Sequence, residues 1–372
     1  MLEADFLARD RWSREELLAF QRERVGALIT HAVTHAPYYR EVLGPDAANR
    51  PLAELPTLPK PTLMSEFDRV ITDPRLRLAD LRAHLAGPDP SRSFLGAYRV
   101  ATTSGTTGRR SIIAFTHDEA AAWRAASVRP MIRLGIGMGS RFAALGSPSP
   151  VHVTRQVLVP PGVPAPAISA ATPISELVRA LNTQQPEVLV GAAGVWRTLA
   201  EEQRDGRLKI APRASHFSSE PLSADLRRRV REAWGIEATS GYAATEAPTI
   251  ATSSPDHPEL EVAEDVVVIE IVDDAGHPVP PGRPVRQGPA HQPDQLRATV
   301  DSLRAERLRG RVSLAQSGRA PLALSALGRW AYCRHPVPPR PGWLDGCCPS
   351  FSPRVGSRAH RRGGKIRLVR SV

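Results

Sequence analysis

The alternation of strand-like and helix-like runs constrains this chain most. Residues 187–190 are typical of a buried strand, and residues 193–202 follow as a candidate helix. Ser223 caps a further helix ahead of a strand over residues 236–239, and residues 266–272 form the strongest strand candidate of the chain. This alternation predicts an α/β fold of layered helices and sheets, with ligands bound at strand ends.

Two capping boxes predict helix starts nearer the N-terminus. Ser13 with Glu16, and Thr116 with Glu119, have the S/T-x-x-E spacing. In that spacing the hydroxyl and the carboxylate each bond a backbone N–H that the first helical turn leaves unpaired. We therefore expect one helix to begin at each box, the second running towards Leu134.

The composition changes near residue 286. Residues 286–372 hold 17 of the 49 basic and 4 of the 38 acidic side chains, so residues 1–285 carry 32 basic and 34 acidic ones. All three cysteines, Cys333, Cys347 and Cys348, also lie beyond residue 285. We expect a folded domain over residues 1–285 and a basic, Pro/Arg-rich tail over residues 286–372, irregular or disordered.

The same counts exclude several classes of function. The net basic charge is confined to the tail, for which a charged, disordered segment is the favoured interpretation, so nucleic acid is not an expected partner. No apolar run approaches the roughly 20 residues of a membrane helix, so no membrane association is expected. The N-terminus is acidic at once, so it does not resemble a secretory signal, and we expect a cytoplasmic protein. Oligomerisation stays open.

A hydroxyl-rich loop is the sharpest chemical signal. It contains Thr103, Ser104, Gly105, Thr106, Thr107 and Gly108. Two glycines let the backbone approach an anion closely, and the hydroxyls add donors for phosphate oxygens. Candidate strands over residues 98–101 and 112–115 frame the loop, so it is not a strand–loop–helix P-loop. Phosphate binding is predicted, and a plain surface linker is the alternative.

A second candidate segment follows the strand over residues 236–239. It reads S-G-Y-A-A-T-E and includes Gly241, Tyr242, Thr245 and Glu246. An aromatic ring can stack on adenine, a threonine hydroxyl can donate to phosphate, and a carboxylate suits Mg²⁺. A plain strand-to-loop junction is the alternative.

Together, the T-S-G-T-T-G loop and the later Y-x-x-T-E segment resemble the adenylate-forming superfamily. Residues 35–40 (H-A-P-Y-Y-R), 55–60 (L-P-T-L-P-K) and 219–222 (S-E-P-L) resemble the phenylacetate–CoA ligase-like family within it. The resemblance covers roughly residues 10–285. The proline-punctuated run over residues 52–61 is expected to cross the surface.

This resemblance implies a reaction and a set of roles. A carboxylic acid attacks the α-phosphate of ATP, and CoA then captures the acyl-adenylate. The loop over residues 102–108 would grip the β- and γ-phosphates, with Gly241 and Tyr242 beside the adenine or acyl group. Thr245 would contact the α-phosphate, Glu246 would bind Mg²⁺, and Glu220 would line the adenine side. His152 has two interpretations, a residue near the acyl pocket and a structural histidine.

The chain also departs from the family pattern. Arg109 and Arg110 stand where many relatives carry a lysine, and neither the ribose-binding Asp nor the C-terminal catalytic Lys can be placed after Val285. We therefore expect a truncated or impaired ligase. The alternatives are a nucleotide-binding protein without turnover and a non-enzymatic, basic-tailed binding protein.

The tail from about residue 287 is interpreted as a frameshifted reading of the family's own C-terminal sequence. With permitted codons, a shift of one base reads Arg-Tyr across Ser302 and Leu303, and Asp across Arg307 and Leu308. These are the residue types that the family has there.

Overall fold

The computed structural model describes residues 2–102, 111–137, 139–158, 167–220, 222–244, 247–272 and 365–369. Its helices are α1 (Leu2–Arg9), α2 (Arg14–His35), α3 (Pro37–Leu43), α4 (Lys60–Ser65), α5 (Phe67–Val70), α6 (Leu78–Ala86), α7 (His117–Arg133), α8 (Ile174–Gln184), α9 (Ala193–Arg204) and α10 (Ala224–Trp234), with 3₁₀ turns η1 (Ala47–Asn49) and η2 (Leu52–Glu54) and π-helical η3 (Thr154–Leu158). Its strands are β1 (Tyr98–Thr102), β2 (Ile112–Thr116), β3 (Phe142–Gly146), β4 (Ala167–Ser169), β5 (Val188–Ala192), β6 (Ala214–Ser218), β7 (Ala238–Ala244), β8 (Ala247–Thr252), β9 (Glu261–Val262), β10 (Val268–Val272) and β11 (Lys365–Val369).

Both predicted capping boxes are confirmed. The Ser13 hydroxyl accepts from the Glu16 backbone N–H at 3.2 Å, and the Glu16 carboxylate accepts from the Ser13 N–H at 2.7 Å. The corresponding contacts at α7 join Thr116 and Glu119 at 3.1 and 2.6 Å. These local hydrogen bonds explain why α2 and α7 begin where they do.

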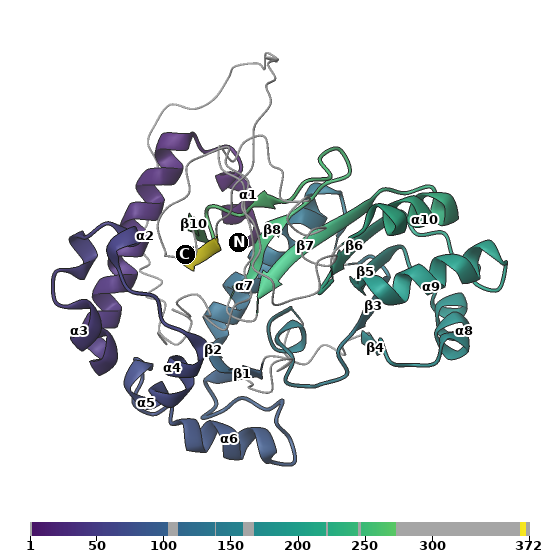
Figure 1. Ribbon diagram of the computed structural model, residues 1–372. Coiled ribbons are helices and arrows are strands. Elements are labelled where there is room, and N and C mark those ends of the chain that lie inside the picture. Colours follow the sequence, from purple (N-terminus) through teal and green to yellow (C-terminus); the bar gives the residue numbers. More distant parts are fainter. Residues whose placement is uncertain are drawn as a thin grey trace.

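Helices α2 to α6 form a helical layer beside the rest of the molecule (Figure 1). Their core contains Tyr39, Leu55, Leu58 and Phe67, each no more than 4% exposed. The expectation that residues 52–61 cross the surface is therefore wrong for Leu55 and Leu58. The prolines around them break helix formation, but the leucines between them pack inward because apolar burial stabilises this layer.

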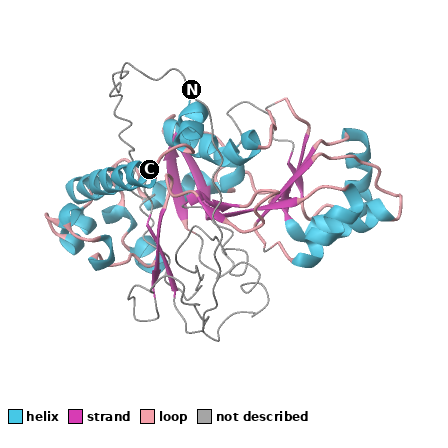
Figure 2. Cartoon of the chain, turned by 90° about the horizontal axis from the view of Figure 1, so that it is seen from above, coloured by secondary structure: helices cyan, strands magenta, loops and turns pink. Residues whose placement is uncertain are grey.

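A seven-stranded sheet forms the centre of the fold, in the order β4-β3-β5-β6-β7-β8-β9. The strands from β4 to β7 run parallel, and β8 and β9 are antiparallel additions. Helices α8, α9 and α10 lie together on one side of it (Figures 1 and 2). Trp196 of α9 stacks on Phe217 of β6, with ring centroids 6.0 Å apart. The predicted α/β fold is confirmed.

Helix α7 packs against the opposite face of this sheet. Leu189 belongs to the α8–α10 core, whereas its neighbours Val188 and Val190 pack with Met131 and Ile136 at the end of α7. Successive residues of a strand point to opposite faces, so helices α8 to α10 cover one face of β5 and α7 covers the other.

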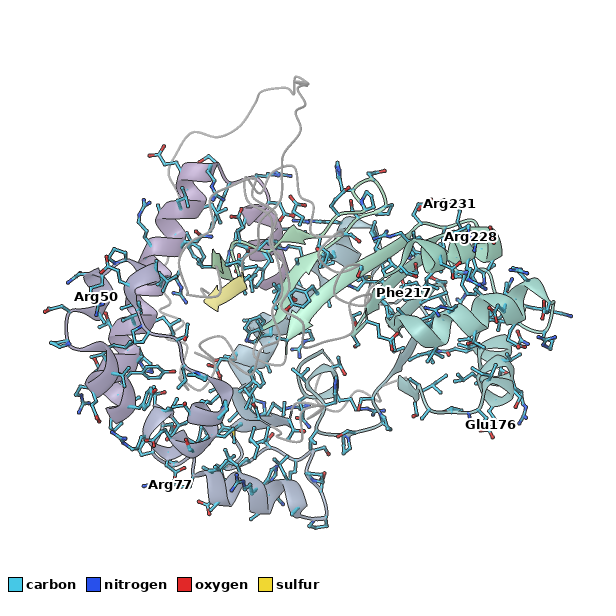
Figure 3. All side chains as sticks on the ribbon, viewed as in Figure 1. Arg50, Arg77, Glu176, Phe217, Arg228 and Arg231 are labelled. Carbon is cyan, nitrogen blue, oxygen red and sulfur yellow. The ribbon has the colours of Figure 1, made fainter. Side chains whose placement is uncertain are left out.

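The outer side of α10 is charged. Arg228 and Arg231 point outward from it (Figure 3) and pair with Glu232 at 3.0 Å and Glu237 at 2.5 Å. Among the described helices, none is both long and apolar enough to cross a bilayer.

The tail contributes one described strand that the sequence pattern did not predict. β11 pairs antiparallel with β10, with Ile271 opposite Ile366. The alternation of polar and apolar residues over residues 365–369 suits strand pairing. Residues 273–364, which include the predicted turn at residues 273–276, lie outside the described part of the chain.

Candidate functional site

Parallel strands bring distant segments to one edge of the sheet. β3, β5, β6 and β7 all run in the same direction, so their carboxyl ends and the loops that follow lie at the same edge. This is where ligands bind in open α/β sheets. The expected location of the site therefore exists in the fold.

The end of β1, the strand that leads into the hydroxyl-rich loop, contacts the segment that follows β3. The Thr102 N–H at the end of β1 donates to the Val151 carbonyl at 2.9 Å, and Thr102 forms a parallel bridge with His152. Val151 follows the end of β3 by five residues, so β1 ends beside the segment that leaves the carboxyl end of β3. Thr103, Ser104, Gly105, Thr106, Thr107 and Gly108 lie outside the described residues, but β1 and β2 confirm the strand–loop–strand setting.

The segment around His152 is held from two sides. Arg99 of β1 donates from Nε to Gln156 Oε1 at 2.9 Å, and Gln156 donates to the Pro150 carbonyl at 2.9 Å. His152 Nδ1 lies 2.8 Å from Thr154 Oγ1, and burial lowers the pKa of His152. The structure thus places His152 beside the foot of the loop, and both interpretations of this residue stay predictions.

Glu220, two residues beyond β6, contacts a helix end. Its carboxylate accepts from the Gly194 N–H at 2.6 Å, in the first turn of α9. Helix α9 has no side-chain cap of its own, so this carboxylate supplies one and complements the positive end of the helix dipole. A Cβ at position 194 would lie 2.8 Å from Glu220 Oε2, so glycine makes the contact possible. Its predicted place on the adenine side stays a prediction.

Gly241 lies close to the ring of His216, which pairs with Thr239 across the neighbouring strand. A Cβ at position 241 would come within 2.5 Å of His216 Nε2, which only glycine avoids. His216 Nδ1 lies 3.1 Å from Thr239 Oγ1. Burial lowers the pKa of His216 to about 4, so its ring is neutral near pH 7.

Tyr242 follows on the same strand. It is half-buried and sits opposite Ala251 of β8. Thr245 and Glu246 come directly after Ala244, the last residue of β7, and lie outside the described residues.

Two residues of this edge escaped the sequence analysis. Gly191, near the end of β5, has φ +117°, and a Cβ there would lie 1.7 Å from the Leu145 carbonyl oxygen. His216 lies in the strand A-S-H-F-S. Successive side chains of a strand point to opposite faces of the sheet, so His216 points away from the face that Phe217 occupies. That alternation was the available signal for His216, whereas nothing in the sequence marked the close approach at Gly191.

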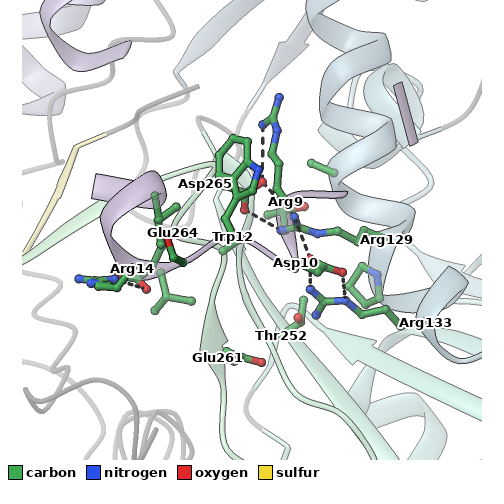
Figure 4. Close-up of a pocket in the computed structure, with 17 residues that line it drawn as sticks. Arg9, Asp10, Trp12, Arg14, Arg129, Arg133, Thr252, Glu261, Glu264 and Asp265 are labelled. Atoms are coloured by element: carbon green, nitrogen blue, oxygen red, sulfur yellow. Dashed lines mark hydrogen bonds and ion pairs between the residues drawn. The ribbon is translucent and has the colours of Figure 1, made fainter. Parts of the chain in front are cut away.

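A separate cavity of about 670 Å³ lies at the turn between α1 and α2, against α7 and β9 (Figure 4). Arg129 forms a two-pronged ion pair with Asp265 at 2.8 and 2.9 Å, and Arg133 pairs with Asp10. The Arg9 guanidinium lies 4.4 Å from the centre of the Phe6 ring. These paired charges hold α1 against α7, which is a structural role.

The fold and the strand-end edge define a class of protein. An open, mostly parallel sheet, together with a Ser/Thr/Gly-rich sequence between β1 and β2, is typical of a nucleotide-binding α/β domain. Residues 41–288 match the AMP-binding enzyme family, and the chain belongs to that family. The resemblance to adenylate-forming enzymes is thereby confirmed.

Two proteins similar to this chain are CoA ligases. A phenylacetate–coenzyme A ligase of Thermus thermophilus is 25% identical over 291 residues, covering 73% of this chain and 60% of that protein. A crystal structure of 2-hydroxyisobutyryl-CoA ligase with 2-HIB-AMP and CoA is similar in fold, with a TM-score of 0.50 and 22% identity over 73% of this chain and 59% of that one. The chain thus spans less than two thirds of the length of each.

Proposed function

We propose that this chain is an ATP-dependent adenylating enzyme that activates a carboxylic acid, with CoA as the acceptor of the acyl group. The observation that carries the proposal is the Thr102–Val151 contact, because Thr102, the last described residue before the hydroxyl-rich loop, lies beside the segment that follows β3. Membership of the AMP-binding enzyme family and the likeness to a CoA ligase support the same chemistry.

The proposed reaction needs alignment and charge neutralisation more than covalent catalysis. The acid carboxylate attacks the α-phosphate, the acyl-adenylate forms, and pyrophosphate leaves. Loop residues 103–108 hold the β- and γ-phosphates through backbone N–H groups and hydroxyls. Thr245 donates to the α-phosphate, and Tyr242 lies against the adenine or the acyl group.

Mg²⁺ fits the donor set of this site. Glu246 supplies carboxylate oxygen, the ligand type that Mg²⁺ prefers together with substrate phosphates. The bound ion would neutralise negative charge on the phosphates. The role of the chain is to hold that carboxylate just beyond the end of β7.

A panel of carboxylic acids in a pyrophosphate-release assay tests the proposal. Release that depends on both ATP and one acid class is the expected result. Replacing Gly105 and Gly108 by valine should abolish ATP·Mg²⁺ binding in a folded protein, because side chains would block backbone approach to phosphate. Glu246→Gln should weaken nucleotide binding in Mg²⁺ but not in EDTA, while exposed Glu232→Gln changes neither.

A second candidate function is nucleotide binding without turnover. It is supported by the sequence analysis, in which neither the ribose-binding Asp nor the C-terminal catalytic Lys of the family could be placed after Val285. Contacts of this kind often contribute a factor of about 10² or more to rate, so CoA thioester formation by this chain is expected to be weak. ATP binding without pyrophosphate release for any acid would support this second function. Absence of ATP binding would support the third hypothesis, a non-enzymatic, basic-tailed binding protein.

A further inference from the structure

β10 lies between two hydrophobic cores of the domain. Val268 packs against the core of the helical layer, and Ile269, the next residue, packs against the core that contains Trp123 of α7. Val266 and Val267, which lead into the strand, are 2% and 0% exposed. Because successive side chains of a strand point to opposite faces, the domain engages both faces of β10 where the strand begins. A further partner of β10 must therefore pair with a backbone edge.

One backbone edge of β10 is paired with the tail. Residues Val268–Val272 pair antiparallel with Lys365–Val369 over five residue pairs (Figure 1). Among the described strands, β11 is the only partner of β10, and their two-stranded sheet is separate from the seven-stranded one. The match to the AMP-binding enzyme family ends at residue 288, so the partner strand comes from outside the matched region.

Backbone pairing makes few demands on the sequence of an added strand. An extended peptide that joins a sheet edge gains affinity from main-chain hydrogen bonds, while its side chains add selectivity. An edge left unpaired presents free N–H and C=O groups to any other extended segment. A tail that was not selected for this fold can therefore still occupy the edge, because it needs only an extended run without proline, such as residues 365–369.

The register favours the chain's own tail over a second copy of β10. It places Arg367 opposite Glu270, and residue types of opposite charge at paired positions favour an antiparallel pair. Residues 268–272 read V-I-E-I-V in both directions, so two copies of β10 paired antiparallel about Glu270 would place this residue opposite itself. Like charges at paired positions destabilise a sheet, so the tail is the better partner.

We propose that β10 is a docking edge for an extended peptide, and that residues 365–369 occupy it as a tethered ligand of the domain. The edge takes a short strand without proline, in which basic and apolar residues alternate as in K-I-R-L-V. The proposed adenylating function is not required for this docking, because only backbone pairing is involved. Its tests therefore use no enzymatic readout, and they can fail while the adenylating function stands.

Two neighbouring proline substitutions in the full chain test the pairing. In an antiparallel pair, only alternate residues of one strand bond to the other strand, so the N–H of either Ile366 or Arg367 points to β10 and the other points away. Ile366→Pro and Arg367→Pro each remove one N–H. Only one of them should lower the hydrogen-exchange protection of residues 268–272, by roughly tenfold. Equal protection in the two variants, whether lost or kept, would overturn the inference.

A peptide added in trans provides a second test. A chain that ends at residue 364 leaves the edge open, and circular dichroism checks that it is folded. A labelled peptide of residues 362–372 should bind it saturably in fluorescence anisotropy, and at least roughly tenfold more weakly to the full chain, whose tethered strand competes at up to about millimolar effective concentration.

The control peptide carries proline in place of both Ile366 and Val369, which keeps the charge but removes an N–H of each facing. It should bind the shortened chain roughly tenfold more weakly than the native peptide. Equal binding of the native peptide to both chains, or no binding to either, would contradict the inference. A dimer of the shortened chain that the peptide does not dissociate would show that a second copy is the preferred occupant, and the inference would be wrong.

Discussion

Single residues shape the strand-end edge through close approaches of backbone and side chains. Gly191 and Gly241 lie on β5 and β7, and each leaves space that a Cβ would fill with a neighbouring atom. At Gly191 the neighbour is a backbone carbonyl, which cannot move aside. At Gly241 it is the His216 ring, which can rotate. Gly191 is therefore needed for the close packing of two strands, whereas Gly241 leaves room for the His216 ring.

Gly191→Ala should destabilise the protein by roughly 2–4 kcal/mol, because a Cβ would overlap the Leu145 carbonyl and the backbone has positive φ. Urea unfolding followed by circular dichroism measures the change. Gly146→Ala at the end of β3 is the matched control, since nothing lies within 4 Å of its Cβ position. Equal stability of the two variants would contradict the steric argument.

His216 should make stability depend on pH. Its pKa is about 4 in the folded chain against 6.5 as the ordinary value, so the unfolded state binds more protons between these two values. Stability should therefore be full above pH 6.5 and fall as the pH drops towards 4. His152, whose pKa is also lowered by burial, adds in the same direction.

The measurement is the free energy of unfolding in urea at pH 7, 5.5 and 4.5. His216→Gln fills similar space without titrating, so it should flatten the slope between pH 6.5 and 4.5. An unchanged slope in that variant would assign the acid sensitivity to other groups. The Arg75 guanidinium lowers the pKa of the Asp73 carboxyl, so this group reduces stability only when the pH falls below its ordinary pKa of 3.8.

At the scale of elements, buried ion pairs attach the first helix to the domain. Arg129 of α7 and Asp265, beyond β9, have side chains only 6% and 8% exposed. Asp10, just after α1, contacts both Arg129 at 3.4 Å and Arg133. Three segments far apart in the chain thus share one set of charges, as Figure 4 shows. Removing one partner leaves another charge buried and uncompensated.

Arg129→Met should cost roughly 3–5 kcal/mol in the free energy of unfolding, because Asp265 would stay buried with only the Arg9 guanidinium, 3.5 Å away, as a partner. Arg228→Met on the exposed face of α10 is the control and should change the free energy of unfolding little, because solvent screens an exposed ion pair. Protease digestion at low enzyme ratio should also release the α1 segment faster in Arg129→Met. Equal stability of both variants would show that these buried pairs do not hold α1.

At the scale of the whole molecule, the family match ends where the composition changes. The match to the AMP-binding enzyme family ends at residue 288, beside the shift to a basic, cysteine-containing tail near residue 286. The agreement of these two boundaries supports the proposal that the tail from about residue 287 is a frameshifted reading. β11 shows that five tail residues still pair with the domain.

Sequencing the gene around codons 285–290 tests the frameshift. We expect a long open reading frame in the neighbouring frame, and we expect it to encode an Arg-Tyr pair and a later Asp. A chain rebuilt in that frame should form CoA thioesters faster than the present one. A neighbouring frame closed by early stop codons would refute the proposal and require a function for the tail itself.

Local structure followed from the sequence, and the assembly of the site did not. The caps at Ser13 and Thr116, and the left-handed glycine at position 235 that ends α10, depend on neighbours within a few residues. Such interactions can be predicted because chain spacing determines distance within one turn. The hydroxyl-rich loop and the Tyr242 segment were found in the same way, as local patterns.

The contacts that assemble the site join residues far apart in the chain. Thr102 meets Val151, Glu220 meets Gly194, and His216 meets Gly241. Sequence spacing says nothing about these distances, because they depend on the order and register of the strands. Only the parallel packing of β3, β5, β6 and β7 decided that these residues lie at one edge of the sheet.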